Sequence, residues 1–198
     1  MSDDRHFPKE VSASDRVLDE AEQLFRSRGY HAVTMRDIAD EVGVRQASLY
    51  YHFPSKEQLF VAVTERMLER HRLGLQRAID QSDRDLRSHL QAAGMWFISQ
   101  PPIHFLSMFH TDMPLLSDAN MNRLLDVATQ SIFAPIRQTF AQAQEQGEIR
   151  DARPELLAGF FLSVIESIPL VTTSPNAAPK EVIVKEMISV LLDGLKPQ

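Results

Sequence analysis

The stretch AVTMRDIADEVGVRQASLYYHFPSKEQLF (residues 32–60) decides the fold of the N-terminal part of this chain. Thr34 is a good N-cap for a short helix, and Gly43 can adopt the backbone angles of a tight turn, so a helix is predicted between them. A second short helix is predicted over residues 45–51, before Pro54 interrupts the helical pattern. Two short helices joined by a tight turn are typical of a helix-turn-helix.

The second of these helices divides into an inward and an outward face. Val44 and Leu49 are predicted to point into a small core, while small and hydrogen-bonding side chains point outward. The outward side chains are Arg45, Gln46, Ala47, Ser48 and Tyr50. Arginine can pair with guanine, glutamine with adenine, serine with either base and a methyl group with thymine. This face therefore fits the major groove of DNA.

Donors at both ends of the motif are candidates for contacts with the phosphate backbone. They are Thr34, Arg36, Tyr51, His52 and Lys56. The N-terminus of a helix capped by Ser55 adds its dipole. The alternative is that Tyr50 and Tyr51 pack in a core and that His52 is a solvated turn residue. The caps, the turn and the spacing together favour DNA binding.

The rest of the chain has a helical pattern with no strand signal of any length. A first helix is predicted from an N-cap at Ser14 to a stop at Gly29, and a fourth begins at Ser55. Further helices are predicted over residues 83–99, 102–110, 118–146, 154–168 and 180–193. The predicted fold class is all-α, with a helix-turn-helix domain over residues 1–55 and a larger helical domain over residues 56–198.

The residues from about Ser14 to Val63 closely resemble the DNA-binding region of the tetracycline-repressor (TetR) family of bacterial transcriptional regulators. The stretch RVLDEAEQLFRSRGY as the first helix and the block LYYHFPSKEQL carry most of this likeness. The resemblance implies phosphate contacts at Thr34 and Arg36 and base contacts on the outward face described above. It also implies a homodimer with a variable second domain.

The composition is that of an ordinary globular protein: of 198 residues, 43% are hydrophobic and 24% charged, and none is cysteine. No run reaches the roughly 18 uninterrupted apolar residues of a membrane span, and the charged start Met1–Glu10 is unlike a secretory signal. We therefore expect a cytoplasmic protein with no membrane partner. The net charge of −6 does not favour nucleic acid, but the segment 45–56 has basic side chains and no acidic one.

Two later helices carry apolar bands that are wider than one core contact needs. A homodimer surface made from two helices of each subunit is predicted there, as the family resemblance implies. The candidate interface residues are Ile132, Ile136, Phe140, Phe160, Phe161, Val164 and Ile165. The alternative is a helix fully buried within one subunit. A dimer would place two recognition helices about 34 Å apart, in successive major grooves.

Methionine, histidine and aromatic side chains gather in the middle of the chain, where they are candidates for an adaptable pocket. They are Met67, His71, Met95, Trp96, Phe105, Met108, Phe109 and Met113. Each of these residues could instead belong to the plain core. If they line a pocket, a lipophilic or aromatic small-molecule effector is the hypothesis.

Catalytic patterns are missing from the sequence: we find no Gly-rich phosphate loop, no Ser–His–acid order and no recognisable carboxylate pair. We therefore expect neither an enzyme nor a cofactor. His104, His110 and Asp112 do not share a helical face, so no metal site is expected. The hypothesis is a homodimeric transcriptional repressor that a small molecule releases from operator DNA. The alternative is an all-α carrier or sensor of lipophilic molecules that acts through protein contacts.

Overall fold

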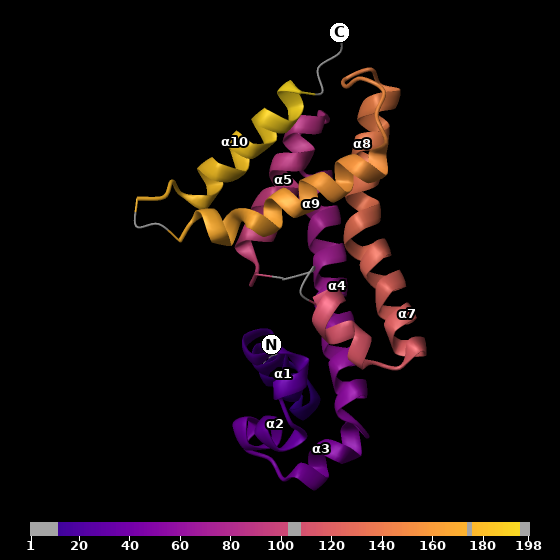
Figure 1. Cartoon of the computed structure of the whole chain (residues 1–198), viewed down its shortest axis with the longest axis vertical. Coiled ribbons are helices and arrows are strands. Elements are labelled where there is room, and N and C mark those ends of the chain that lie inside the picture. Colours follow the sequence, from indigo (N-terminus) through magenta and orange to yellow (C-terminus); the bar gives the residue numbers. More distant parts are fainter. Residues whose placement is uncertain (1–11, 103–107, 174–175, 195–198) are drawn as a thin grey trace, which may run out of the picture. The chain divides into compact units, whose positions relative to one another are not determined.

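The computed structural model describes residues 12–102, 108–173 and 176–194 (Figure 1). Within those ranges the chain is built from helices and contains no strand, which confirms the all-α prediction. The N-terminal helices are α1 (Ala13–Ala32), α2 (Met35–Val42), α3 (Gln46–His52) and α4 (Lys56–Asp80). The later helices are α5 (Leu86–Ser99), α7 (Asp118–Ala128), α8 (Ala134–Glu145), α9 (Pro154–Val171) and α10 (Lys180–Asp193).

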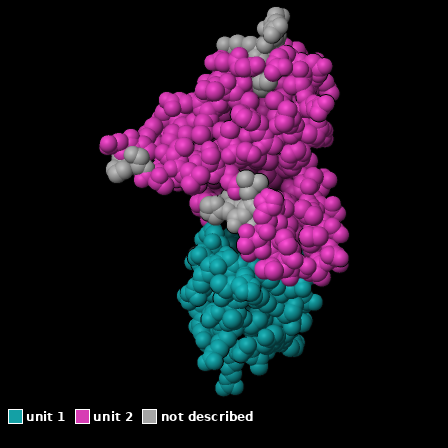
Figure 2. All heavy atoms as spheres, viewed as in Figure 1, with its two compact units in different colours: residues 1–64 teal, residues 65–198 magenta. Residues whose placement is uncertain are grey.

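The chain forms two compact units that divide after Thr64, inside α4 (Figure 2). The boundary expected from the sequence lies earlier, where α4 begins. The first turns of α4 belong to the first unit because Phe60 packs there: its ring meets Phe25 edge-on at 5.2 Å between centroids and lies 4.8 Å from the ring of Tyr30. An aromatic cluster of this kind is a hydrophobic core for a three-helix motif.

The helix α2 begins and ends as the sequence predicts. Thr34 Oγ1 accepts a hydrogen bond from the Asp37 amide at 3.1 Å, and the Asp37 carboxylate accepts one from the Thr34 amide at 2.8 Å. These two bonds form a capping box, which satisfies donors that the first helical turn leaves open. Gly43 ends α2 in the left-handed conformation, with φ 75°. Ser55 caps α4 by accepting from the Gln58 amide at 3.1 Å.

The helix α1 differs from the prediction at both ends. Its N-cap is Ser12, which accepts from the Asp15 amide at 3.0 Å, so the predicted cap at Ser14 is wrong. Gly29 ends the regular part of the helix, as predicted, but one more helical turn follows it. It interrupts the helical geometry with φ 76° and ψ 161°, and helical structure continues to Ala32. The predicted stop is therefore a kink close to the end of α1.

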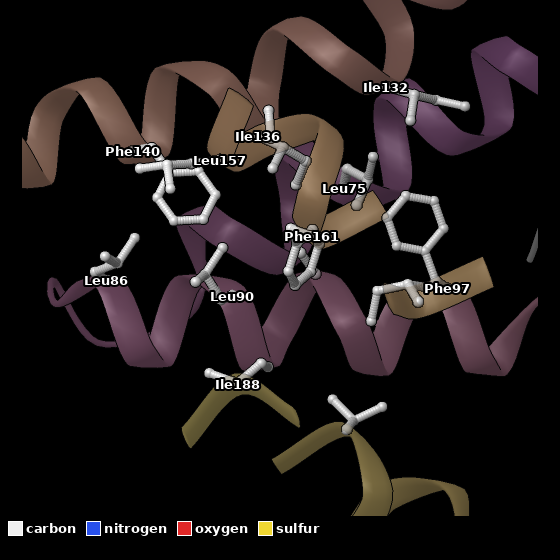
Figure 3. Close-up of a cluster of buried hydrophobic side chains, with 14 of the residues drawn as sticks. Leu75, Leu86, Leu90, Phe97, Ile132, Ile136, Phe140, Leu157, Phe161 and Ile188 are labelled. Atoms are coloured by element: carbon white, nitrogen blue, oxygen red, sulfur yellow. The ribbon is translucent and has the colours of Figure 1, made fainter. Parts of the chain in front are cut away.

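The second unit has its own hydrophobic core, which α5, α8, α9 and α10 surround (Figure 3). Phe140 of α8 and Phe161 of α9 are at most 1% exposed, and Leu90 of α5 packs in the same cluster. The helices α5 and α10 approach closely at Gly94, where a Cβ atom would lie 2.6 Å from a methyl group of Val184. Small and large side chains thus interlock across this core.

The predicted helix over residues 118–146 is interrupted in its middle. Between α7 and α8 the chain makes one π-helical turn, η3 (Thr129–Phe133). Pro135, the second residue of α8, explains the wider turn, because proline lacks a backbone N–H and its ring clashes with regular helical packing. Gly147, with φ 74°, then reverses the backbone after α8 as predicted.

The segment around residue 110 is more irregular than the sequence suggests. Of the predicted helix over residues 102–110, residues 103–107 lie outside the described part of the chain, and so do the candidate residues His104 and Phe105. The π-helical turn η1 (Met108–Asp112) and the 3₁₀ turn η2 (Met113–Leu115) follow. The last helix, α10, has the predicted bounds.

Candidate functional site

The helix α3 presents a continuous exposed face. Its exposed side chains include Arg45 at the N-cap position, Gln46, Ala47 and Ser48. Tyr50 is also 44% exposed, whereas Leu49 is 1% exposed and fills the core beneath. The helix thus keeps its hydrogen-bonding side chains in solvent and anchors itself through one leucine, in the orientation that the sequence predicts.

The end of α3 carries two more exposed groups. Tyr51 is 85% exposed, and its ring lies edge-on to the imidazole of His52 at 5.2 Å between centroids. An aromatic side chain of a core would be covered on both faces. The alternative that the tyrosines pack in the interior is therefore wrong for Tyr51.

Thr34 and Arg36 lie at the start of α2, and both are exposed. The Thr34 hydroxyl donates to the Asp37 carboxylate at 2.6 Å, so its proton is used inside the capping box. This bond is the main cause that holds the pKa of Asp37 below its ordinary value. The Arg36 guanidinium is 3.7 Å from the carboxylate of Asp40 in an exposed pair. Such a pair is weak in water, so Arg36 stays available to a phosphate group.

Lys56 is the first residue of α4, and its ammonium group turns back to α1. Nζ donates to the carbonyl oxygen of Tyr30 at 3.0 Å and lies 3.5 Å from that of His31. It also lies 4.2 Å from the centroid of the Tyr30 ring. Burial lowers the pKa of Lys56. The sequence predicts only a phosphate contact for Lys56 and gives no sign of these internal partners.

The second unit contains a small cavity between α4, α5, α9 and α10, with a volume of about 50 Å³. Its apolar walls come from Phe97, Ile98, Pro101, Pro102, Leu162, Ile165, Ile168 and Pro169. Its polar groups come from His71, Gln100, Glu166 and Lys180. This space is large enough for a few water molecules. Pockets for drug-sized ligands are larger, at about 300–1,000 Å³.

Among the described residues, His71 is the one predicted pocket residue that lines this cavity. Its imidazole stacks on the ring of Phe97 at 5.6 Å and accepts a hydrogen bond at Nδ1 from the indole of Trp96 at 3.3 Å. Trp96 therefore lies behind the cavity wall. The remaining described candidates do not line the cavity: they are Met67, Met95, Met108, Phe109 and Met113. They are buried or half-buried among other side chains, which agrees with the alternative that they belong to the plain core.

The predicted dimer surface needs a correction at most of its positions. Five of the candidate residues are between 0% and 8% exposed and lie in the core of the second unit. They are Ile132, Ile136, Phe140, Phe161 and Ile165. They have almost no surface left for a second subunit. Phe160 is 53% exposed and Val164 is half-buried, so these two stay available.

An apolar groove of about 720 Å³ runs between α9 and α10. It is lined by Leu156, Leu157, Phe160, Val164, Val171, Ile183, Glu186, Met187, Val190, Leu191 and Gly194. Leu156 is 68% exposed and Val190 is 77% exposed. In the described part of the chain, α9 is also long and apolar enough to cross a membrane by length and composition, a test that core helices pass as well.

The arrangement of the first unit, with an exposed α3 after a glycine turn, defines a helix-turn-helix protein. Residues 17–63 match the family described as "Bacterial regulatory proteins, tetR family". The first unit of the chain is thus similar to this family. The match covers α1 from its second turn, all of α2 and α3, and the first turns of α4.

Curated relatives are similar over the same region. The HTH-type transcriptional activator FasR of Mycolicibacterium smegmatis is 40% identical over 77 residues, which are 39% of this chain and 35% of FasR. The HTH-type transcriptional repressor KstR2 of Rhodococcus jostii is 42% identical over 76 residues, which are 38% of this chain and 37% of KstR2. The chain thus spans about a third of the length of these relatives.

The fold is shared more widely than the sequence. The crystal structure of AibR in complex with isovaleryl coenzyme A and operator DNA superposes with a TM-score of 0.76, at 22% identity, over 91% of this chain and 98% of that one. Both units of this chain therefore have the fold of that regulator.

Proposed function

We propose that this chain is a DNA-binding transcriptional regulator, and specifically a homodimeric repressor that a small molecule releases from its operator. The single observation that carries the proposal is the exposed face of α3, which projects donors into solvent above the buried Leu49. Arg45 and Gln46 are the base-reading residues, because their side chains can make paired hydrogen bonds with guanine and adenine. Ala47, Ser48 and Tyr50 complete the base-reading surface.

Contacts with phosphate groups would hold this surface against the groove. Arg36 of α2, and Tyr51 and His52 in the last turn of α3, are exposed and can donate to phosphate oxygens. These contacts carry little sequence information but supply much of the affinity and make it depend on salt. The segment 45–56 has basic side chains and no acidic one, which allows such binding despite the net charge of −6 of the whole chain.

A second copy of this chain is the proposed occupant of the groove between α9 and α10. Phe160 and Val190 line the groove and are exposed, and contiguous exposed apolar patches mark interfaces. A two-fold axis would place the same patch of both subunits face to face. Two copies would also provide the two reading heads, about 34 Å apart, that a near-palindromic operator needs.

The cavity of the second unit is the proposed effector site. Its walls are mainly apolar and its few polar groups include His71 and Glu166, which suits a lipophilic or aromatic molecule with a polar end. Because the cavity measures about 50 Å³, such a molecule must widen it, which would move the helices that line it. The crystal structure of AibR, which is similar in fold, contains isovaleryl coenzyme A and operator DNA.

Release from DNA requires that the effector prefer the conformation that does not fit the operator. A shift from almost fully competent to almost fully incompetent needs a preference on the order of 10⁴-fold, or about 5.5 kcal/mol. Trp96 offers a direct probe of effector binding, because it is the single tryptophan of the chain and bonds to the cavity residue His71. A library of small molecules can be screened by the change in its fluorescence.

The decisive experiment is binding of the purified protein to DNA from the region upstream of its own gene, compared with a shuffled duplex of the same composition. We expect the protein to bind the upstream DNA at concentrations at which the shuffled duplex stays unbound. Equal or no binding to both would contradict the proposal and favour the carrier or sensor that acts through protein contacts. A reporter gene behind the bound DNA separates repression from activation: deletion of the regulator should raise its transcription.

A further inference from the structure

A lysine at the first position of a helix is unfavourable for that helix. The N-terminus of α4 has partial positive charge, so an ammonium group there is repelled. Tyr30 and His31 are among the last residues of α1, beyond Gly29, and their carbonyl oxygens are acceptors for an ammonium group. The Lys56 ammonium group is directed to α1: Nζ lies 3.0 Å from the Tyr30 carbonyl oxygen and 3.5 Å from that of His31.

The side chain of Tyr30 strengthens the same contact. Its ring centroid lies 4.2 Å from the Lys56 ammonium, within the range of a cation–π interaction. Tyr30 is 8% exposed, and its ring packs 4.8 Å from that of Phe60, one turn after Lys56 on α4. A cation, two carbonyl groups and two rings therefore form one contact between the end of α1 and the beginning of α4.

This contact closes the chain around the whole helix-turn-helix. Between Tyr30 and Lys56 the chain runs through α2, the glycine turn and α3. His31 comes three residues before the N-cap of α2, and Lys56 comes four residues after the last residue of α3. One ammonium group thus joins the entrance of α2 to the exit of α3.

We propose that Lys56 is a positioning residue for operator recognition: its ammonium group fixes the two ends of the helix-turn-helix and so sets how α3 is presented, instead of binding a phosphate group. The proposal rests on the proposed DNA-binding function. Its geometric support is that the donors of Lys56 are directed to the carbonyl oxygens of α1 and that the side chain is half-buried. Arg36 serves as the comparison, because its side chain is exposed and its guanidinium lies beside a carboxylate instead of backbone carbonyl oxygens.

The first experiment tests the contact in the free, full-length protein. Lys56→Met keeps the length of the side chain but removes its charge and donors, and Lys56→Arg keeps both. Amide hydrogen exchange over residues 29–34 should become about tenfold faster in Lys56→Met and return close to the original rate in Lys56→Arg. If Lys56→Met does not fold, Lys56→Gln, which keeps a neutral donor, takes its place with an intermediate rate expected. Unchanged exchange in the neutral variant would overturn the proposal.

The second experiment separates positioning from phosphate binding by means of salt. The probe is a duplex that the unmodified protein selects from a random-sequence library, and affinity is measured over a range of salt concentrations. Lys56→Met should weaken binding about tenfold and leave the slope of log affinity against log salt unchanged, because no phosphate contact is lost. The matched control Arg36→Gln should make that slope shallower by about 0.9 per lost contact.

The outcomes distinguish a failure of this proposal from a failure of the proposed DNA-binding function. A shallower slope in Lys56→Met, by about the amount seen in Arg36→Gln, would show a phosphate contact and overturn the positioning role. Unchanged affinity and slope would overturn it as well. If the unmodified protein selects no duplex, the proposed DNA-binding function fails, while hydrogen exchange still reports whether Lys56 joins the two helices.

Discussion

The indole Nε1 of Trp96 donates a hydrogen bond to Nδ1 of His71 at 3.3 Å, which joins α5 to α4 beside the cavity of the second unit. Because Nδ1 accepts, the neutral imidazole carries its proton on Nε2. The indole ring fits against α4 because residue 74 is glycine: a Cβ there would lie 2.0 Å from Cζ2 of Trp96. The packing of these two helices therefore depends on the missing side chain.

Gly74→Ala should destabilise the protein by about 1–3 kcal/mol, because the added methyl group overlaps a ring that is held by a hydrogen bond. Alanine is otherwise the better helix former by about 1 kcal/mol, so a loss would have to come from the clash. The midpoint of urea unfolding measures it. Gly159→Ala in α9 is the matched control, since nothing lies within 4 Å of a Cβ there, and it should be neutral or stabilising. A gain in stability in both variants would contradict this account of the α4–α5 contact.

The capping box of α2 should make stability depend on pH in the acid range. Hydrogen bonds from Thr34 hold the pKa of Asp37 below its ordinary value of 3.8. A carboxyl group with a depressed pKa in the folded state contributes stability that is fully present above its ordinary pKa and is lost as the pH falls through the folded value. The stability difference between the unmodified protein and Asp37→Asn should therefore shrink below about pH 3.8.

Urea unfolding between neutral and acid pH measures this difference. Asp40→Asn is the control, because it removes a carboxylate of the same helix that takes no part in the capping box. A constant difference between the unmodified protein and Asp37→Asn down to the lowest pH would argue against the role of the ionised carboxylate.

Phe160→Glu should break the dimer. The substitution places a charge in the lining of the groove between α9 and α10, where a second copy would bury it without a partner. The expected cost is about 2 kcal/mol or more of association free energy. Sedimentation should then show a shift to monomer. Val182→Glu is the matched control: Val182 is 41% exposed on α10 but does not line the groove, so its variant should stay dimeric. A dimer that tolerates Phe160→Glu would move the interface elsewhere.

Local signals in the sequence predict the first unit well because they act within a few residues. The Thr34 cap, the Gly43 turn and the Ser55 cap are each found where the spacing places them. The kink at Gly29 and the π-helical turn before Pro135 are harder to predict. Glycine and proline indicate an irregularity in a helix, but they do not indicate whether the helix ends there.

Long-range partners leave a weaker trace in the sequence. An apolar band looks the same whether it packs inside a subunit or against a second one, so Ile136 and Phe140 were assigned to an interface although the core contains them. Methionines and aromatic residues likewise serve a core as well as a pocket. The hydrogen-bond acceptors of Lys56 are backbone carbonyl groups, which every residue has, so no pattern of side chains could indicate them.

The central claim, that the outward side chains of α3 read base edges, is tested most directly by repeating the selection of duplexes from a random-sequence library with Arg45→Ala and with Gln46→Ala. The account predicts a two-fold symmetric consensus for the unmodified protein. It also predicts that each variant relaxes the preference at its own symmetry-related base pairs, at about 1–3 kcal/mol per lost paired contact. Recovery of one and the same consensus by all three proteins would contradict it.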